Sequence, residues 1–518
     1  MVPLSVMSKR PSGVFLPPIS LERASSWPLY KQLYEAIRQS ILRGTLRKGL
    51  RLPSTRTLAH ELGVSRNIVV IAFEQLLAEG YIESRTGAGT FVTGTLPEDV
   101  LQVESNPLNG NRKLSGRGNT LKRLPQLALP ARDPRLRYAP FRYGLPALDE
   151  LPLDLWGRLL ARHCRKAPAE IAVHGEAAGL LRLREAITTY VGAARGVRCH
   201  AGQIIVVNGS QQAIDLAARV LADPGDVAII EDPGYIGARS ALQAAGMELI
   251  PISVGKEGLR VLLLSQKHLS AKLVYVTPSH QFPLGVVLSL ANRLQLLDWA
   301  AQNDAWIIED DFDSEYRYES KPIPALQGLD RNARVIYIGT FSKVLFPSLR
   351  FGYLIVPEDL IDTFLAARWV SDRCSPLIEQ AALADFIAEG HLASHVRRMR
   401  TLYMERRAVM VETIRERLGD LVETWDAEAG MHTVAWLPSG VDDSLISATA
   451  AQSGLFVLPA SEFALRPMAR GGLLLGYAAF APAVIRKGIR DLELVVRKHA
   501  RRPQPVRLGR EGRLRRCD

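Results

Sequence analysis

The sequence predicts an α/β protein in two parts: a small helical domain with a short hairpin, and a large domain built on a mostly parallel sheet. Two observations carry this prediction. Apolar residues recur at helical spacing within residues 27–95, and short apolar runs alternate with helical stretches within residues 141–500. A chain of 518 residues is also longer than one ordinary core requires, so more than one domain is expected.

The composition is that of a globular protein without a membrane span. Hydrophobic residues make up 47% of the chain, yet no apolar run approaches about 18 residues, the length that a transmembrane helix needs. Prolines interrupt the extension of residues 1–26, which argues against a secretion signal, so we expect a cytoplasmic protein. The four cysteines lack Cys-x-x-Cys spacing, which predicts free thiols and neither a disulfide framework nor a metal site.

Positive charge is concentrated at the two ends of the chain. Residues 1–95 contain 12 Lys and Arg against 6 Asp and Glu, and residues 501–518 contain 7 against 2, within a formal net charge of +12. This asymmetry favours a polyanionic partner for the front end and separate chemistry in the body. Basic surface that serves only solubility is the alternative. The tail 501–518 has no core-forming pattern.

Three helices are expected at the front. The first ends near Gly44 and carries apolar residues at helical spacing: Leu29, Leu33, Ile37 and Ile41. Ser54 is placed to cap a second helix, which Gly63 ends. Ser65 is placed to cap a third, whose inward face is assigned to Ile68, Ala72 and Leu76.

A two-stranded wing is expected next, because YIESRTGAGTFVT alternates around a Thr-Gly-Ala-Gly turn. The motifs LPSTRTLAHELGVSRN and GAGTFV resemble the winged helix-turn-helix of the GntR family of bacterial regulators, over about 70 residues. The resemblance implies that residues 27–95 bind a double-stranded DNA operator through six residues: Arg56, Ser65, Arg66, Asn67, Thr86 and Gly87. Alternatively, Arg56 and Arg66 only pair with nearby acids such as Glu61 and Glu79.

Residues 96–140 are interpreted as a flexible linker. They are rich in Pro, Gly, Asn and basic residues and lack sustained periodicity. The linker either only connects the two domains or also touches DNA phosphates with its basic groups.

Five apolar runs predict strands of the parallel sheet: IIVV (204–207), VAII (227–230), KLVYVT (272–277), AWIIED (305–310) and RVIYIG (334–339). Ligands of such sheets bind beyond the carboxyl ends of the strands. After these runs come a helix start suited to an anion, the aromatic Tyr235, the acid Asp310 and the amine of Lys343. Anion cradle, aromatic plate, buried acid and amine are the groups that pyridoxal phosphate requires.

The body resembles the fold-type-I aminotransferases in the motifs EDPGY, TPSHQFPLG, EDDFDSEYRY, PALQGLD and IGTFSKVLFPSLRFGY. The whole combination is similar to the MocR subfamily of GntR regulators. This resemblance implies pyridoxal 5'-phosphate as cofactor, Lys343 as its Schiff-base lysine, Asp310 as partner of the pyridinium nitrogen and Tyr235 as the stacking ring. It further implies a phosphate site formed by Ser210, Gln211, Thr340, Ser342 and Arg350.

The acids of EDDFDSEY are not equivalent. Asp311 is adjacent to Asp310 and is the alternative partner of the pyridinium nitrogen. Asp313 and Glu315 are interpreted as solvated or structural.

The chain departs from related sequences at three positions. Phe312 replaces a tyrosine whose hydroxyl serves the cofactor's phenolic oxygen, so His280 or Gln281 is a candidate donor; a purely structural histidine is the alternative. His174 stands where relatives carry a tyrosine that helps the phosphate. Leu474 stands where amino-acid-using relatives carry an arginine for the substrate α-carboxylate, which a leucine cannot bind.

These observations predict a DNA-binding transcriptional regulator whose aminotransferase-like domain senses pyridoxal phosphate or an amine effector through the Lys343 Schiff base. The resemblance implies a head-to-tail homodimer, with operators that contain paired half-sites or direct repeats. The first alternative is a catalytically active aminotransferase that carries a DNA-binding domain, which Phe312 and Leu474 disfavour. The second is a DNA-binding protein whose body is only a dimerisation scaffold.

Overall fold

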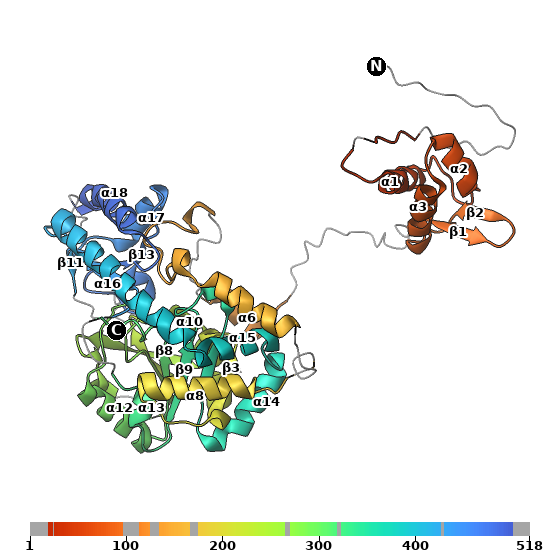
Figure 1. Cartoon of the computed structure of the whole chain (residues 1–518). Helices are drawn as coiled ribbons and strands as arrows, with labels where there is room; N and C mark the ends of the chain where they lie inside the picture. The colour runs from red at the N-terminus through yellow and green to blue at the C-terminus, as the bar shows by residue number, and fades with distance from the viewer. Residues whose placement is uncertain are drawn as a thin grey trace, which may run out of the picture. The chain divides into compact units, whose positions relative to one another are not determined.

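The computed structural model describes residues 19–23, 25–96, 113–124, 134–165, 173, 175–264, 270–318, 323–425 and 429–500. They fall into two compact units, Met1–Lys113 and Leu114–Asp518, and each is described by itself (Figure 1). His174, the tail 501–518 and most of the extension 1–26 lie outside the described residues, so the predictions made for them stay predictions. No helix in the described part of the chain is long and apolar enough to cross a membrane.

The first unit is a winged helix-turn-helix, as predicted. Its elements are α1 (Leu29–Leu42), α2 (Thr55–Leu62), α3 (Arg66–Ala78), β1 (Ile82–Arg85) and β2 (Gly89–Val92). The two strands are antiparallel, with Ile82 opposite Val92. One apolar face of each helix packs with these two residues into a single small core.

The ends of α2 follow the sequence signals closely. Ser54 Oγ accepts a hydrogen bond from the backbone N of Thr57 at 3.2 Å, which satisfies one of the free amides of the first turn. Gly63 ends the helix in the left-handed region at φ +61°. Ser65 occupies the equivalent position before α3, but its side chain makes no capping hydrogen bond, so that expectation was wrong.

The buried face of α3 is rotated relative to the prediction. Its buried residues are Val69, Ala72, Phe73 and Leu76, whereas Ile68 is only half-buried. The two larger side chains at i and i+4, Val69 and Phe73, therefore set the phase of the helix. This phase leaves Arg66 and Asn67 exposed in the first turn.

The second unit is built on an eight-stranded sheet of order β3-β10-β9-β8-β7-β4-β5-β6. Its strands are β3 (Ile204–Val207), β4 (Val227–Asp232), β5 (Glu248–Gly255), β6 (Gly258–Leu259), β7 (Ala271–Val276), β8 (Trp306–Asp311), β9 (Val335–Thr340) and β10 (Gly352–Ile355). Strands β4, β5, β7, β8 and β9 pair in parallel, while β10 and β6 pair antiparallel with their neighbours. The five predicted runs are β3, β4, β7, β8 and β9, which confirms the mostly parallel sheet.

Helices cover both faces of this sheet. One layer packs on Ile205 and Val207 and contains α9 (Ser210–Leu221), α10 (Ile236–Ala244) and α14 (Ile361–Asp372). The other packs on Ile204 and Val206 and contains α6 (Leu153–Arg165), α8 (Leu181–Arg195) and α15 (Leu377–Ala388). Along the same layer, α12 (Leu290–Gln302) and α13 (Leu326–Leu329) cover the other half of the sheet. Alternate residues of each strand thus face opposite layers.

A C-terminal subdomain follows, with its own antiparallel sheet of order β11-β12-β14-β13. Its elements are α16 (His391–Leu418), β11 (Glu423–Thr424), β12 (His432–Trp436), α17 (Asp443–Gln452), β13 (Leu458–Pro459), β14 (Gly472–Gly476) and α18 (Pro482–Ala500). The register places Val434 opposite Leu474 and His432 opposite Gly476. His432, Val434 and Leu474 therefore point to the same face of this sheet.

One helix, α5 (Gly116–Arg123), lies within the segment predicted as a linker. Ser115 begins it, because its Oγ accepts a hydrogen bond from the backbone N of Gly118 at 3.0 Å. Lys122 and Arg123 occupy its last turn, where basic side chains complement the helix dipole. None of its residues is buried.

Candidate cofactor site and DNA-binding surface

Lys343 follows β9 at the carboxyl end of the sheet. Its Nζ donates a hydrogen bond to the carbonyl oxygen of Gly144 at 3.3 Å and lies 4.9 Å from the centre of the Tyr143 ring. Burial lowers the pKa of Lys343 to about 8, although the charges of Asp313 and Asp310 oppose this change. A lysine with such a pKa is partly neutral near neutral pH, which makes it a usable nucleophile.

Asp310 lies in the same region, near the carboxyl end of β8. Its Oδ2 accepts a hydrogen bond from the Tyr275 hydroxyl at 2.7 Å, whereas its Oδ1 is buried and has no partner. Burial raises the pKa of Asp310 to about 7, the Tyr275 hydrogen bond lowers it, and neighbouring Asp311 raises it. A buried carboxylate oxygen without a donor fits a ligand that brings a cationic N–H.

Asp311 has a different role. Arg195 of α8 binds it from two nitrogens, with Nε at 2.7 Å and Nη2 at 3.2 Å, and the Tyr337 hydroxyl donates to it at 2.6 Å. Burial alone would raise the pKa of Asp311, but the charge and hydrogen bonds of Arg195 leave it below its ordinary value. Its oxygens are thus committed to the fold, and of the two neighbours only Asp310 offers a free one.

The loop between β3 and α9 forms an anion cradle together with Arg350. Gly209 has φ +86° and precedes Ser210, the first residue of α9, so backbone amides of the first turn are free. Arg350 Nη2 donates to the carbonyl oxygen of Asn208 at 2.9 Å. A Cβ at Gly209 would lie 3.1 Å from that guanidinium, so a glycine is needed for the close approach.

Two hydroxyl residues precede Lys343: Thr340 ends β9, and Ser342 follows it. Thr340 Oγ1 accepts a hydrogen bond from the backbone N of Ser342 at 3.2 Å. Ser342 Oγ is buried and has no partner. This orphan hydroxyl and the guanidinium of Arg350 are chemically suited to a phosphate group.

Tyr235 and Gln211 close the site at the start of α10. The Tyr235 hydroxyl donates to Gln211 Oε1 at 3.5 Å, and the Gln211 amide donates to the carbonyl oxygen of Gly237 at 2.9 Å. The Tyr235 ring lies edge-on to Phe282, with centres 6.0 Å apart. Burial, and secondarily the charge of Asp310, raises the pKa of Tyr235 to about 12.

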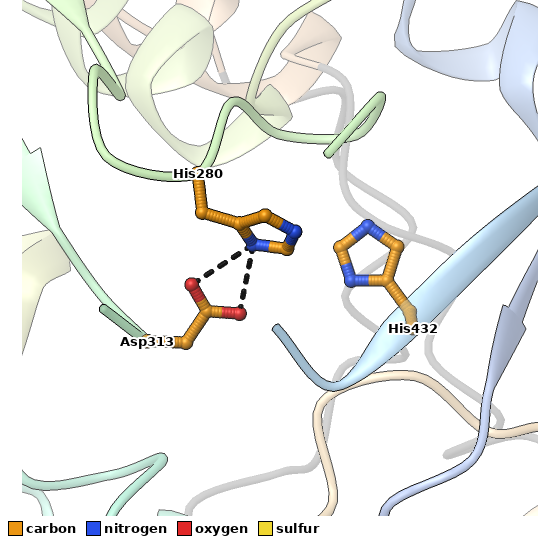
Figure 2. Close-up of side chains that lie close together, drawn as sticks. All are labelled: His280, Asp313 and His432. Atoms are coloured by element: carbon orange, nitrogen blue, oxygen red, sulfur yellow. Dashed lines mark hydrogen bonds and ion pairs between the residues drawn. The ribbon is translucent and has the colours of Figure 1, made fainter. Parts of the chain in front are cut away.

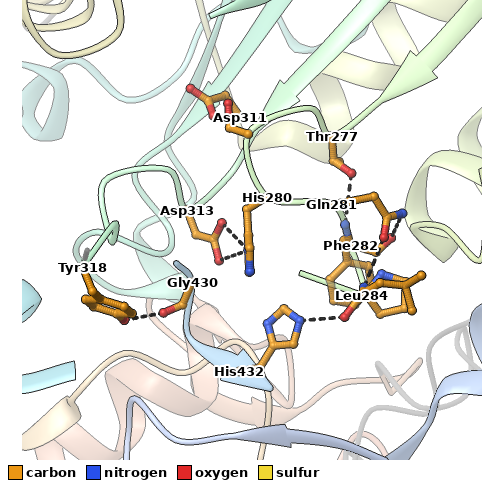
Figure 3. A network of polar contacts seen from close by, with 12 residues as sticks. Thr277, His280, Gln281, Phe282, Leu284, Asp311, Asp313, Tyr318, Gly430 and His432 are labelled. Carbon is orange, nitrogen blue, oxygen red and sulfur yellow. Dashed lines mark hydrogen bonds and ion pairs between the residues drawn. The ribbon is translucent and has the colours of Figure 1, made fainter. Parts of the chain in front are cut away.

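His280 and Gln281, the two candidate donors in the TPSHQFPLG loop, make different contacts. Gln281 Nε2 donates to the carbonyl oxygen of Pro233 at 2.9 Å. It also donates to the carbonyl oxygen of Phe282 at 2.6 Å (Figure 3), so its amide is used by the loop. His280 Nδ1 lies 3.0 Å from both carboxylate oxygens of Asp313, while its Nε2 is buried without a partner (Figure 2). Asp313 is buried, so its interpretation as solvated was wrong and the structural one holds.

Four residues of the site were not singled out as site residues from the sequence: Tyr143, Tyr275, Asp313 and His432. Tyr275 lies within an apolar run, where a hydroxyl next to an acid across the sheet gives no local signal. His432 lies on a short strand that the sequence pattern did not reveal. Leu474 is buried, opposite Val434, and the expectation that this position cannot bind a carboxylate stays a prediction.

The predicted DNA contacts are all exposed on the first unit: Arg56, Ser65, Arg66, Asn67, Thr86 and Gly87. Among the described residues, neither Arg56 nor Arg66 forms an ion pair. Arg66 Nε only approaches Thr55 Oγ1 at 3.4 Å. Glu79, one of the acids considered as their partner, instead accepts hydrogen bonds from Tyr34 and Gln75.

Comparisons with known proteins match both units. Residues 29–92 match the bacterial regulatory proteins of the gntR family, and residues 152–490 match aminotransferase class I and II. The chain is 42% identical to the probable rhizopine catabolism regulatory protein MocR of Rhizobium meliloti, over 91% of this chain and 94% of that protein. It is 34% identical to the pyridoxine biosynthesis transcriptional regulator PdxR of Corynebacterium glutamicum, over 90% of this chain and 96% of that protein.

A solved structure supports the fold of the second unit. The crystal structure of an archaeal alanine:glyoxylate aminotransferase aligns with a TM-score of 0.69 and 28% identity, covering 74% of this chain and 98% of that one. The winged helix-turn-helix, the aminotransferase fold and the site at the carboxyl end of its sheet therefore occur together in one chain. This chain belongs to the MocR-type transcriptional regulators, in which a GntR DNA-binding domain is joined to an aminotransferase class I and II domain whose cofactor is pyridoxal phosphate.

Proposed function

We propose that the protein regulates transcription in response to an amine effector, or to pyridoxal phosphate itself, which it senses through Lys343. One observation carries the proposal. A lysine with a lowered pKa, a buried carboxylate oxygen without a partner and an anion cradle meet at one edge of the sheet. An exposed DNA-reading surface is part of the same chain.

The residues present fit the cofactor. Lys343 would attach it, Asp310 Oδ1 would accept the hydrogen bond of the ring nitrogen, and Tyr235 would stack on the ring. The phosphate would lie in the cradle of Ser210, Gln211, Thr340, Ser342 and Arg350. When bound, pyridoxal phosphate supplies an aldehyde carbon that reacts reversibly with primary amines.

The second candidate function is a working aminotransferase with a DNA-binding domain. Lys343, Asp310 and Arg350 favour it, because they are the groups that hold and activate the cofactor in catalysis. Leu474 and Phe312 disfavour it, because both are apolar and buried: Leu474 where the substrate α-carboxylate would need a cation, and Phe312 where the cofactor's phenolic oxygen would need a hydroxyl. Steady conversion of a keto acid by the purified protein, measured as cofactor cycling between aldehyde and amine forms, would establish it.

Regulation also requires that effector binding to the second unit changes how the first unit binds DNA. We propose a head-to-tail homodimer, which would present two DNA-binding units to paired half-sites or direct repeats. An effector then acts only through the difference in its affinity for two arrangements of those units. Analytical ultracentrifugation of the full chain tests the dimer, since a monomer at micromolar concentration contradicts it.

The first test is the visible spectrum of the protein with pyridoxal phosphate. Wild type is expected to show a visible cofactor band that Lys343→Ala loses completely, because the lysine forms the covalent link. Lys272→Ala is the matched control, since Lys272 is an exposed lysine elsewhere on the sheet. An identical band in Lys343→Ala would refute the assigned role of this lysine.

The second test is DNA binding. Fluorescence anisotropy with the intergenic DNA upstream of the gene is expected to show specific binding that changes when the cofactor or an amine is added. The salt concentration must be held constant, because phosphate contacts make affinity strongly salt-dependent. A DNA affinity that does not change with the cofactor or with an amine would contradict the sensor and support DNA binding alone.

A further inference from the structure

Two buried histidines face each other beside the cofactor site. His280 and His432 are 2% and 1% exposed, and their ring centres are 5.2 Å apart (Figure 2). One nitrogen or oxygen of each of His280, Asp313 and His432 lies within 4.8 Å of the others. The pair comes from different parts of the second unit, the loop after β7 and strand β12.

The outer nitrogen of each ring is held by the fold. His280 Nδ1 is directed at the carboxylate of Asp313, at 3.0 Å from both oxygens. His432 Nε2 donates to the carbonyl oxygen of Pro283 at 2.9 Å (Figure 3). In a neutral ring the proton therefore lies on the outer nitrogen, and the inner nitrogen carries a lone pair.

The two inner nitrogens, His280 Nε2 and His432 Nδ1, are buried and have no partner. Burial, and secondarily the neighbouring His280, lowers the pKa of His432 to about 3, so this ring is neutral at physiological pH. A buried acceptor without a donor, such as His432 Nδ1, is costly to leave unsatisfied. A ligand that brings a hydrogen-bond donor would satisfy it.

These nitrogens lie in the region of Lys343, whose charge acts on His432. The Tyr143 ring lies 4.9 Å from Lys343 Nζ and edge-on to His432, with ring centres 5.0 Å apart. His432 shares one face of its sheet with Val434 and Leu474. The apolar side chains that pack on this face include Phe282, Phe312, Val434, Phe456, Phe463 and Leu474. The region thus combines one reactive amine and one neutral acceptor with apolar side chains.

We propose that His432 Nδ1 accepts a hydrogen bond from the effector, and that the effector is an amino alcohol, a primary amine with a neighbouring hydroxyl and no carboxylate. This inference rests on the proposed function. A hydroxyl brings the one donor that His432 Nδ1 needs. A carboxylate brings only acceptors, and it would face the lone pair of His432 and a leucine, where an unpaired anion is costly.

Two other occupants fit less well. A zinc ion is one of them. Structural zinc sites use four protein ligands and catalytic sites three. Asp313 is already bound to His280 Nδ1, so only two nitrogens, His280 Nε2 and His432 Nδ1, would be left to bind a metal. A carboxylate near Lys343 could instead bind Arg142. Burial is the largest cause of the lowered pKa of Lys343, and the charge of nearby Arg142 lowers it further. Its guanidinium already donates to the Arg137 carbonyl and lies 5.9 Å from the Phe456 ring centre.

Three amines with one carbon skeleton test the inference: 2-aminopropan-1-ol, 2-aminopropane and alanine carry a hydroxymethyl, a methyl or a carboxylate beside the same amine carbon. Each is titrated into the cofactor-loaded full chain, and the change of the visible cofactor band gives its affinity. We expect 2-aminopropan-1-ol to bind about five-fold more tightly than 2-aminopropane, the effect of one net hydrogen bond. Alanine should bind most weakly.

Variants at His432 assign the effect to the lone pair. His432→Leu removes it and should abolish the preference for the amino alcohol, whereas His432→Asn keeps an acceptor near the position of Nδ1 and should restore much of it. His200→Leu is the matched control, because His200 is an exposed histidine paired with Glu358. If His432→Leu fails to fold, the ranking of the three amines by wild type and by His432→Asn decides alone.

Three results would overturn the inference: equal affinity for 2-aminopropan-1-ol and 2-aminopropane, tightest binding of alanine that Arg142→Ala abolishes, or stoichiometric Zn²⁺ retained by wild type and lost in His432→Leu. No response to any of the three amines overturns it as well. In each case a cofactor band that still depends on Lys343 leaves the proposed function standing. Loss of that dependence in the same samples is the separate failure of the proposed function.

Discussion

The two units of this chain expose their functional residues to opposite degrees. In the first, every predicted DNA contact is exposed, and the small core lies beneath them. In the second, Asp310, His280 and His432 are buried, and Lys343 and Tyr235 are partly buried. The difference shows that recognition of a large polyanion and recognition of a small molecule place opposite demands on burial.

This contrast has an energetic consequence. An exposed arginine costs the fold little, because its charge stays hydrated, so its removal should change binding and leave stability unaffected. A buried acid is costly unless it is paired, so its removal or that of its partner should change stability and pH dependence. The following four predictions would break or sharpen this distinction.

The largest effect is expected from Arg195→Ala. The substitution leaves Asp311 buried without its ion pair, which should lower the free energy of unfolding by about 3–5 kcal/mol. Urea unfolding at neutral pH measures it. Arg162→Ala is the matched control: Arg162 is half-exposed and pairs with Asp385 and Glu389, so its loss should cost far less than the loss of Arg195. Equal losses in both variants would remove the contrast between buried and exposed pairs.

Burial of Asp310 is expected to make the stability of the second unit depend on pH. Burial raises the pKa of Asp310 to about 7 in the folded chain, above the value of about 4 in the unfolded chain. The folded state therefore binds the proton more tightly, and stability is lost as pH rises from about 4 through 7. The cofactor-free wild type should lose on the order of 3 kcal/mol more than Asp310→Asn between pH 4 and pH 8. Parallel stability profiles of the two proteins would contradict this.

Arg66→Ala tests the exposed surface. It should weaken operator binding by about 1–3 kcal/mol, because a recognition-helix arginine contacts base edges or a phosphate. The melting temperature should not change, since Arg66 has no ion pair among the described residues. Arg198→Ala, an exposed arginine of the second unit, is the control in the same anisotropy assay. A fall in stability with unchanged DNA affinity would reverse the assignment.

The smallest effect is expected from Ser54→Ala. It removes the capping hydrogen bond to Thr57 and should cost about 1 kcal/mol in the stability of the first unit. Ser65→Ala is the matched comparison, because Ser65 holds the same position before α3 without a side-chain capping bond, and it should cost less. Thermal unfolding of both variants, followed by circular dichroism, gives the ranking.

Five strands of the large sheet, β3, β4, β7, β8 and β9, could be predicted because they are largely buried on both faces and read as continuous apolar runs. The small sheet was not predicted, because β11 and β13 have two residues each and leave no periodic pattern. The face of α3 was misjudged by one residue, since its apolar residues surround most of the helix and tertiary packing chooses among them.

The site was predictable where a motif follows a strand, and not where it depends on contacts distant in sequence. Lys343 and Tyr235 follow β9 and β4, and Asp310 lies near the carboxyl end of β8, where ligands of parallel sheets bind. Whether Asp310 or Asp311 has a free oxygen depends on Arg195, more than a hundred residues earlier. His432 is placed at the site by the register of the second sheet, which no local sequence pattern predicts.

The contact between Lys343 and Gly144 has a consequence for the proposed regulation. Gly144 lies a few residues after the predicted linker 96–140, and Tyr143 beside it contacts both Lys343 and His432. A ligand that takes Lys343 away from this carbonyl would change a contact of the segment that follows the predicted linker. If such a ligand changes the affinity for operator DNA, linkage is reciprocal, and operator DNA changes the affinity for the ligand by the same factor. Under the proposed function, operator DNA would then act as a second ligand of the sensor.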